Sequence, residues 1–133
     1  MQRNIMLILT LMLSGRAMTL AYIHRAGGAM PGDPPAAWLM PLMGDAVIGI
    51  TGLFVAYLIW YRVGLWAWTT IIVWNAIAIW DALSAFIIHT TNPWPEFFML
   101  ELLGSSMFFA ASAMHIMVLV LACRPAVRKQ YLG

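Results

Sequence analysis

Four long apolar runs divide the chain, and each of them is long enough to cross a lipid bilayer. The runs cover residues 5–23, 38–60, 66–88 and 97–123. A transmembrane helix needs about 20 mostly apolar residues, because the hydrocarbon core of a bilayer is about 30 Å thick. Charged residues make up only 9% of the chain, whereas soluble domains average about 25%. We therefore predict an all-α integral membrane protein in which residues 1–133 form a single domain of four transmembrane helices.

The positive residues indicate how this bundle is oriented, because cytoplasmic loops of membrane proteins carry an excess of Lys and Arg. A cytoplasmic N-terminus would place five positive residues on that side: Arg3, Arg62, Arg124, Arg128 and Lys129. Only Arg25 would lie on the other side. Short connections make sequential helices antiparallel neighbours. The sequence thus predicts an up-down four-helix bundle in the bacterial inner membrane, with both termini cytoplasmic.

Several function classes find no support in the residues. The net charge of +2 is small and the basic residues form no groove-like patch, so nucleic acid is not an expected partner. The single Cys123 allows no internal disulfide and matches no metal motif. The serines of the last span, Ser105, Ser106 and Ser112, have no nearby base, so we expect no catalytic residues. An enzyme is not the favoured interpretation.

Four charged residues interrupt the apolar runs, one in each span: Arg16, Asp45, Asp81 and Glu101. At about 1.5 Å of rise per helical residue, Arg16 and Asp45 lie about 10 Å from the outer end of their spans and Asp81 about 12 Å. Glu101 lies only about 6 Å in, within reach of the membrane interface. Charge in hydrocarbon costs about 2.5–3.5 kcal/mol per residue on insertion scales, so these groups need partners or a function.

Helical spacing places these residues on narrow polar faces. At about 100° per residue, the fourth span aligns Glu101, Gly104, Ser105, Phe108, Ser112 and His115. The second span aligns Asp45, Gly49, Gly52 and Ala56. The third aligns Ala78, Ala82, Ala85 and His89, with Asn75 and Asp81 on either side. Small residues let transmembrane helices approach closely, so we expect these faces to meet in the bundle interior.

His115 is predicted to lie apart from the charged layer, in the inner half of the bilayer, with Asn75 near the middle of its own span. Imidazole can bind haem or metal. A bis-histidine haem needs a second histidine at matching depth, however, and His24 and His89 both fall at the outer end. A hydrogen bond from His115 to Ser112 or Asn75 is the favoured arrangement. No cofactor and no metal site are predicted.

Two segments resemble a family of small bacterial four-helix membrane proteins of uncharacterised function. Pro41-Leu42-Met43-Gly44-Asp45 with Gly49 resembles that family's Pro-x-x-Gly-Asp-x-x-x-Gly segment. Trp74-Asn75 with Asp81 and Ala85 is similar to its Trp-Asn-x-x-Gly-x-x-Asp-x-x-x-Ala segment, although Ala78 stands where the family usually has glycine. His115 matches a late histidine of the pattern. The resemblance covers about residues 38 to 120; it implies a four-helix fold and no activity, and includes neither Arg16 nor Glu101.

Three functions stay open at this point. The favoured one is a non-enzymatic accessory or assembly subunit of a larger inner-membrane complex, which has other membrane subunits or further copies of itself as partners. The second is a small transporter or a proton- or cation-coupled ligand-binding protein that uses Asp45 and Asp81, with Arg16 as counter-ion. The third is a redox subunit that holds haem or quinone near His115. The polar layer can also be purely structural, with Arg16 neutralising Asp45 or Asp81.

Overall fold

The computed structural model describes residues 1–25, 37–93 and 104–133, and these residues form helices joined by short turns. The elements in chain order are α1 (Gln2–Ser14), the 3₁₀ helix η1 (Gly15–Met18), α2 (Thr19–Arg25), α3 (Leu39–Tyr61), α4 (Leu65–Thr91), α6 (Ser106–Cys123) and α7 (Pro125–Leu132). Four helical segments are long and apolar enough to cross a membrane: Gln2–His24, Leu39–Tyr61, Leu65–Thr91 and Ser106–Cys123. The predicted all-helical class with four candidate spans is therefore confirmed.

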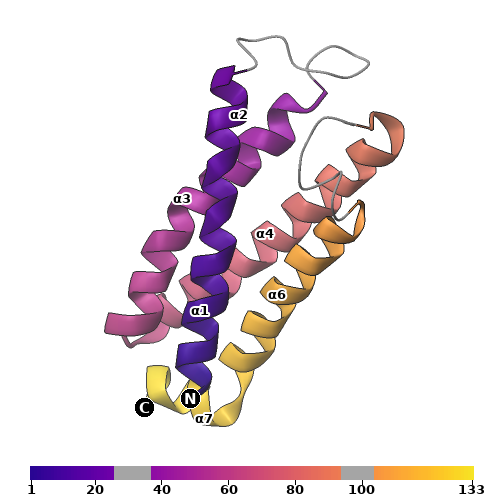
Figure 1. Cartoon of the computed structure of the whole chain (residues 1–133). Coiled ribbons are helices and arrows are strands. Elements are labelled where there is room, and N and C mark those ends of the chain that lie inside the picture. Colours follow the sequence, from indigo (N-terminus) through magenta and orange to yellow (C-terminus); the bar gives the residue numbers. More distant parts are fainter. Residues whose placement is uncertain (26–36, 94–103) are drawn as a thin grey trace.

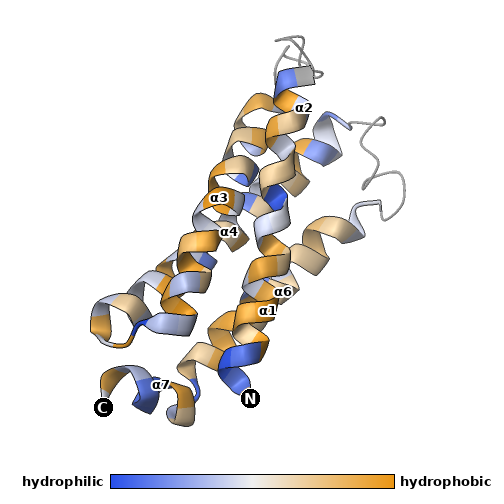
Figure 2. Ribbon diagram, turned by 60° about the vertical axis from the view of Figure 1, so that its left-hand side comes forward, coloured by the Kyte–Doolittle hydropathy of each residue, from blue (hydrophilic) through white to orange (hydrophobic). Residues whose placement is uncertain are grey.

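The four long segments alternate in direction along the bundle, and both termini lie at the same end (Figure 1). The hairpin between α3 and α4 lies at this end too, because the Gly64 amide donates a 2.7 Å hydrogen bond to the Tyr131 carbonyl of α7. Apolar residues make up most of the helical ribbon, and hydrophilic residues lie at the end that holds the termini, at the opposite end near α2 and at a few points between (Figure 2). The cytoplasmic placement of that end stays a prediction.

The start of the fourth helix differs from the prediction. The apolar run at 97–123 predicted one continuous helix, but α6 begins only at Ser106, and residues 97–103 lie outside the described part of the chain. Gly104 has a φ of 57°, a left-handed backbone angle that glycine tolerates and that does not continue an α-helix. The apolar pattern could not reveal this turn, because Gly104 is itself compatible with a transmembrane helix.

Two features of the helices were not expected from the sequence. The first span is not one α-helix, since the 3₁₀ segment η1 separates α1 from α2. After α6, Arg124 is extended, with φ −61° and ψ 137°, and Pro125 then starts the short helix α7. Proline is well suited to the first helical position, because the amide it lacks would have no partner there. Val127 and Tyr131 of α7 are buried against the bundle.

The core runs along the middle of the bundle and lies mostly between the polar layer and the end that holds the termini. Its fully buried side chains include Met6, Leu58, Ile59, Ile71 and Val118, contributed by all four long segments. Three members of the seam predicted on the third span are also buried, since Ala78, Ala82 and Ala85 are at most 3% exposed, whereas His89 is half-buried. These small residues allow close helix packing without large side chains between the helices.

Candidate functional site

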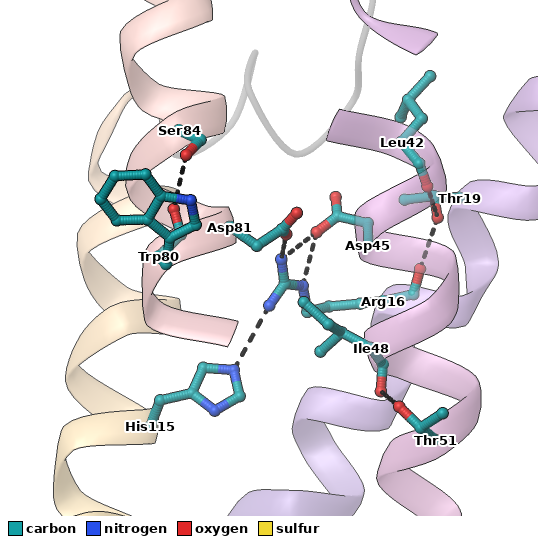
Figure 3. A network of polar contacts seen from close by, with 10 residues as sticks. All are labelled: Arg16, Thr19, Leu42, Asp45, Ile48, Thr51, Trp80, Asp81, Ser84 and His115. Atoms are coloured by element: carbon teal, nitrogen blue, oxygen red, sulfur yellow. Dashed lines mark hydrogen bonds and ion pairs between the residues drawn. The ribbon is translucent and has the colours of Figure 1, made fainter. Parts of the chain in front are cut away.

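Arg16 lies at the centre of a polar network that joins the four helical segments (Figure 3). Its Nε donates a 2.6 Å hydrogen bond to Oδ1 of Asp45 on α3, and its Nη2 forms an ion pair with the same oxygen. Nη2 also donates a 2.5 Å hydrogen bond to Oδ2 of Asp81 on α4. Nη1 lies 3.4 Å from Nε2 of His115 on α6. One guanidinium thus contacts two carboxylates and one imidazole.

The 3₁₀ segment and a glycine on α3 position the arginine. A Cβ atom built on Gly49 would lie 2.7 Å from Cα of Ala17, so only glycine lets the η1 backbone lie directly against α3 at this point. Thr19 fixes the same contact, because its hydroxyl lies within hydrogen-bonding distance of the Arg16 carbonyl at 2.8 Å and of the Leu42 carbonyl at 3.2 Å. The arginine side chain therefore leaves a backbone that is held against α3.

A second glycine makes room for the carboxylate of Asp81. A Cβ atom on Gly44 would lie 3.0 Å from Cγ of Asp81 and even closer to its Oδ1. Any side chain at position 44 would therefore push Asp81 away from Arg16. Gly44 precedes Asp45 in the chain, so this Gly-Asp pair provides both one carboxylate and the space for the other.

The hydrogen bonds around His115 define its tautomer. Asn75 Nδ2 donates to the Ile71 carbonyl at 2.8 Å, which leaves Oδ1 of Asn75 as an acceptor. That oxygen lies 2.9 Å from Nδ1 of His115, so Nδ1 carries the proton. Nε2 then carries the lone pair of the ring, and this lone pair faces the N–H of Arg16 Nη1. A neutral imidazole in this tautomer satisfies both neighbours, whereas an imidazolium would point an N–H at the guanidinium.

The network contains more negative than positive charge. Arg16 carries one positive charge, and Asp45 and Asp81 are two acids, so full ionisation leaves a net charge of −1. The side chains of Arg16, Asp45 and Asp81 are 13%, 24% and 18% exposed, respectively. The arginine is the most enclosed of the three, and each carboxylate retains some accessible surface. The site is therefore largely buried, where unbalanced charge is costly, and its two carboxylates keep a small accessible surface.

Most of the candidate residues predicted from the sequence meet in this site. Arg16, Asp45 and Asp81 are in direct contact, and His115 and Asn75 extend the network towards the core. The predicted hydrogen bond between His115 and Asn75 is present. Glu101 lies outside the described residues. The sequence did not identify Thr19, whose signal is a polar residue three positions after Arg16 in an apolar run.

The predicted separation of His115 from the charged layer is wrong, because its Nε2 lies 3.4 Å from Nη1 of Arg16. Counting from residue 97 placed it in the inner half of the bilayer, away from the charged layer. Because α6 begins at Ser106, His115 lies only about 14 Å from the start of its helix, level with Arg16. A depth count depends on the residue at which the helix begins, and the turn at Gly104 changed that residue.

The donors of the site do not match a haem site or a metal site built from three or more His, Cys, Asp or Glu ligands. Within the described residues, no cluster of three or more His, Cys, Asp or Glu side chains could hold a metal ion. Both ring nitrogens of His115 are engaged, Nδ1 with Asn75 and Nε2 with Arg16, so this arrangement offers no free lone pair to haem iron. The site can instead exchange protons, bind a small cation, or form ion pairs.

The fold and the site together define a class: a four-helix bundle of membrane-spanning length and hydrophobicity with one Arg–Asp–Asp–His network among its helices. No protein-family model, curated protein or solved structure matches the chain. The resemblance to small bacterial four-helix membrane proteins therefore rests on the segments around Asp45, Asp81 and His115 alone.

Proposed function

We propose that the chain is a small multi-pass protein of the bacterial inner membrane that binds a proton or a small cation at Asp45 and Asp81 and uses it for transport or coupled ligand binding. Arg16 is the resident counter-ion. The observation that carries this proposal is the charge ratio of the site, in which two carboxylates contact a single guanidinium. One additional positive charge makes the site neutral.

The physical argument concerns the cost of unbalanced charge in a membrane. A net charge in the hydrocarbon region is unfavourable, and intramembrane ionisable residues often mark ion or proton pathways. The guanidinium cannot lose its proton in proteins, so the extra negative charge must be neutralised at a carboxylate. The side chains of Asp45 and Asp81 are 24% and 18% exposed, which supports a route by which a cation reaches the carboxylates.

The proposal is tested with the purified full chain in proteoliposomes that contain a pH-sensitive dye. With an imposed gradient of protons or of a monovalent cation, we expect a flux above that of empty vesicles. Asp45→Asn and Asp81→Asn should lower it to the background. Ser84→Ala is the matched control, because Ser84 lies one turn from Asp81 on the same helix and, among the described residues, its hydroxyl bonds to the Trp80 carbonyl alone. Its flux should be that of the native protein.

Infrared difference spectra provide a readout of binding without transport. Adding the cation, or lowering the pH, should change the carboxyl bands in the native protein and leave smaller changes in each Asn variant. A binding signal without flux would identify a coupled binding protein instead of a transporter. If neither flux nor a carboxyl signal depends on Asp45 or Asp81, the proposal is wrong.

A second candidate function is an accessory subunit of a larger membrane complex, and Trp80 favours it. Tryptophan is normally enriched at the two membrane interfaces. Trp80 instead lies near the middle of α4, is 74% exposed, and points away from Arg16 (Figure 3). Exposed tryptophans are common anchors in protein interfaces. A subunit, or a second copy of the chain, that packs over Trp80 would lie next to the residue that follows it, Asp81.

The accessory function is tested by purification from native membranes in a gentle detergent. A stoichiometric partner that is lost in Trp80→Ala and retained in Trp66→Ala would support it, because Trp66 is similarly exposed, at 53%, but lies at the end of the helix. A lone monomer in the native preparation would contradict it.

A further inference from the structure

A recess opens at the end of the bundle that holds the termini, far from the Arg16 network. It has a volume of about 520 Å³ and lies between the first turn of α1, the end of α3 and the outer side of α7. Its lining combines the polar side chains of Gln2, Arg3, Asn4 and Gln130 with the apolar or aromatic ones of Met1, Trp60 and Ala126. It contains one positive side chain, several amides and no carboxylate side chain. Such a lining suits an anionic group that also accepts hydrogen bonds.

Arg3 is held in a fixed position at the wall of this recess. Its Nε donates to the Ile59 carbonyl at 3.0 Å, and its Nη2 donates to the Ile59 and Trp60 carbonyls at 2.5 and 2.8 Å. These carbonyls belong to the last turn of α3, where a cation is favourable for the helix dipole. The ring of Tyr131 lies 5.5 Å from the guanidinium carbon on another side. None of the contacts with the Ile59 and Trp60 carbonyls uses Nη1, so its N–H groups are the ones left for a ligand in the recess.

The charged side chains around the recess are all positive. Four further cations lie at this end of the bundle: Arg62, Arg124, Arg128 and Lys129. The acidic side chains within the described residues are Asp45 and Asp81, and Asp45 lies about 24 Å along α3 from its end at Tyr61. No acidic side chain of the described part thus compensates the cations near the recess.

We propose that this recess binds the phosphate headgroup of an anionic phospholipid. The recess lies at the level of Trp60, an exposed tryptophan at the end of a membrane-spanning helix, which is the depth of lipid headgroups. Basic residues next to transmembrane helices attract anionic lipids. Arg3 contacts the phosphate through Nη1, and the amides of Asn4 and Gln130 donate to its remaining oxygens. This site is independent of the proposed cation site.

The test is a titration of the purified full chain with phosphatidylglycerol, followed by native mass spectrometry, with phosphatidylcholine as the zwitterionic reference. Gln130→Glu places a negative charge in the recess at an exposed residue, and we expect it to weaken phosphatidylglycerol binding about fivefold. Arg3→Gln should weaken it about tenfold. Lys129→Gln is the matched control: it changes the net charge by the same amount as Gln130→Glu, next to it in the chain but outside the lining of the recess.

Each outcome of this titration bears on the proposal. A loss in Gln130→Glu with less than about a twofold change in Lys129→Gln supports a defined headgroup site. Equal losses in both variants overturn it, because the binding is then diffuse attraction to a basic surface. Equal binding of phosphatidylcholine also overturns it, as does displacement of the lipid by an equal concentration of inorganic phosphate. The Gln130 variant keeps the test decisive if Arg3→Gln does not fold.

Discussion

Replacing Arg16 is expected to destabilise the bundle far more than replacing either of its acidic partners. Arg16→Gln leaves Asp45 and Asp81 facing each other without a cation. Asp45→Asn leaves one guanidinium and one carboxylate, which form a neutral pair. The two substitutions remove one charge each from the same network, so a difference between them measures the balance of charges in the site and not the mere presence of polar groups.

The expected size of this difference follows from the contacts. One ion pair at about 4 Å, with an effective dielectric constant of about 20, is worth about 4 kcal/mol. Both carboxylate oxygens contact Nη2 of Arg16, so they lie within about 5 Å of each other and repel by about 3 kcal/mol. Asp45→Asn thus loses about 4 and recovers about 3 kcal/mol, a net cost of about 1 kcal/mol. Arg16→Gln loses both attractions, and the typical cost of removing one partner of a buried pair is about 3–5 kcal/mol.

The assay is unfolding of the detergent-solubilised protein by increasing fractions of sodium dodecyl sulfate, followed by tryptophan fluorescence from the seven tryptophans. Asp45→Asn and Asp81→Asn should unfold close to the native midpoint, and Arg16→Gln at a clearly lower one. The double variant Asp45→Asn/Asp81→Asn leaves the guanidinium unpaired and should resemble Arg16→Gln. If a single Asn variant costs as much stability as Arg16→Gln, the two-acid, one-base description of the site is refuted.

Two further predictions concern packing and pH. Gly49→Ala should lower the stability by about 1–3 kcal/mol in the same assay, because its Cβ would meet the backbone of Ala17. Gly15→Ala is the control, since Gly15 has open space around it, and it should leave the stability unchanged or raise it slightly. Equal effects of the two substitutions would contradict the close approach of η1 and α3. Burial raises the pKa of the Tyr131 phenol above its ordinary value of 10.0. The neutral phenol, which donates a 3.2 Å hydrogen bond to the Ile59 carbonyl, therefore stabilises the docked α7 below pH 10. This contribution is lost as the pH rises through the raised pKa. An absorbance titration, which follows the formation of tyrosinate, should show one tyrosine ionising above pH 10.

The charged site could be predicted in part because depth follows from counting residues. A helix rises by about 1.5 Å per residue, so the positions of Arg16, Asp45 and Asp81 within their spans place them in one layer. The positions of the small residues on the second and third spans likewise predicted which faces are buried. These inferences need only the ends of the helices, and the ends of α3 and α4 lie within three residues of the predicted ones.

The pairing within the layer could not be predicted in the same way. Whether Arg16 contacts one acid or both depends on the rotation and separation of three helices, and a change of one residue turns a helix by about 100°. Gly44 decides this point, since it leaves the space that the Asp81 carboxylate occupies. A glycine in an apolar run does not reveal which atom of another helix will fill the space beside it.

The sequence alone determined that four spans form one helical bundle, because backbone groups in hydrocarbon must be satisfied within each helix and apolar length alone selects the spans. It also determined that charges from different spans share one depth. Only the tertiary structure decided that Arg16 binds Asp45 and Asp81 together and that His115 joins them, because the turn at Gly104 and the close approach at Gly49 set the helix positions. Contacts between helices depend on offsets of a few ångströms, and no pattern within a single helix encodes those offsets.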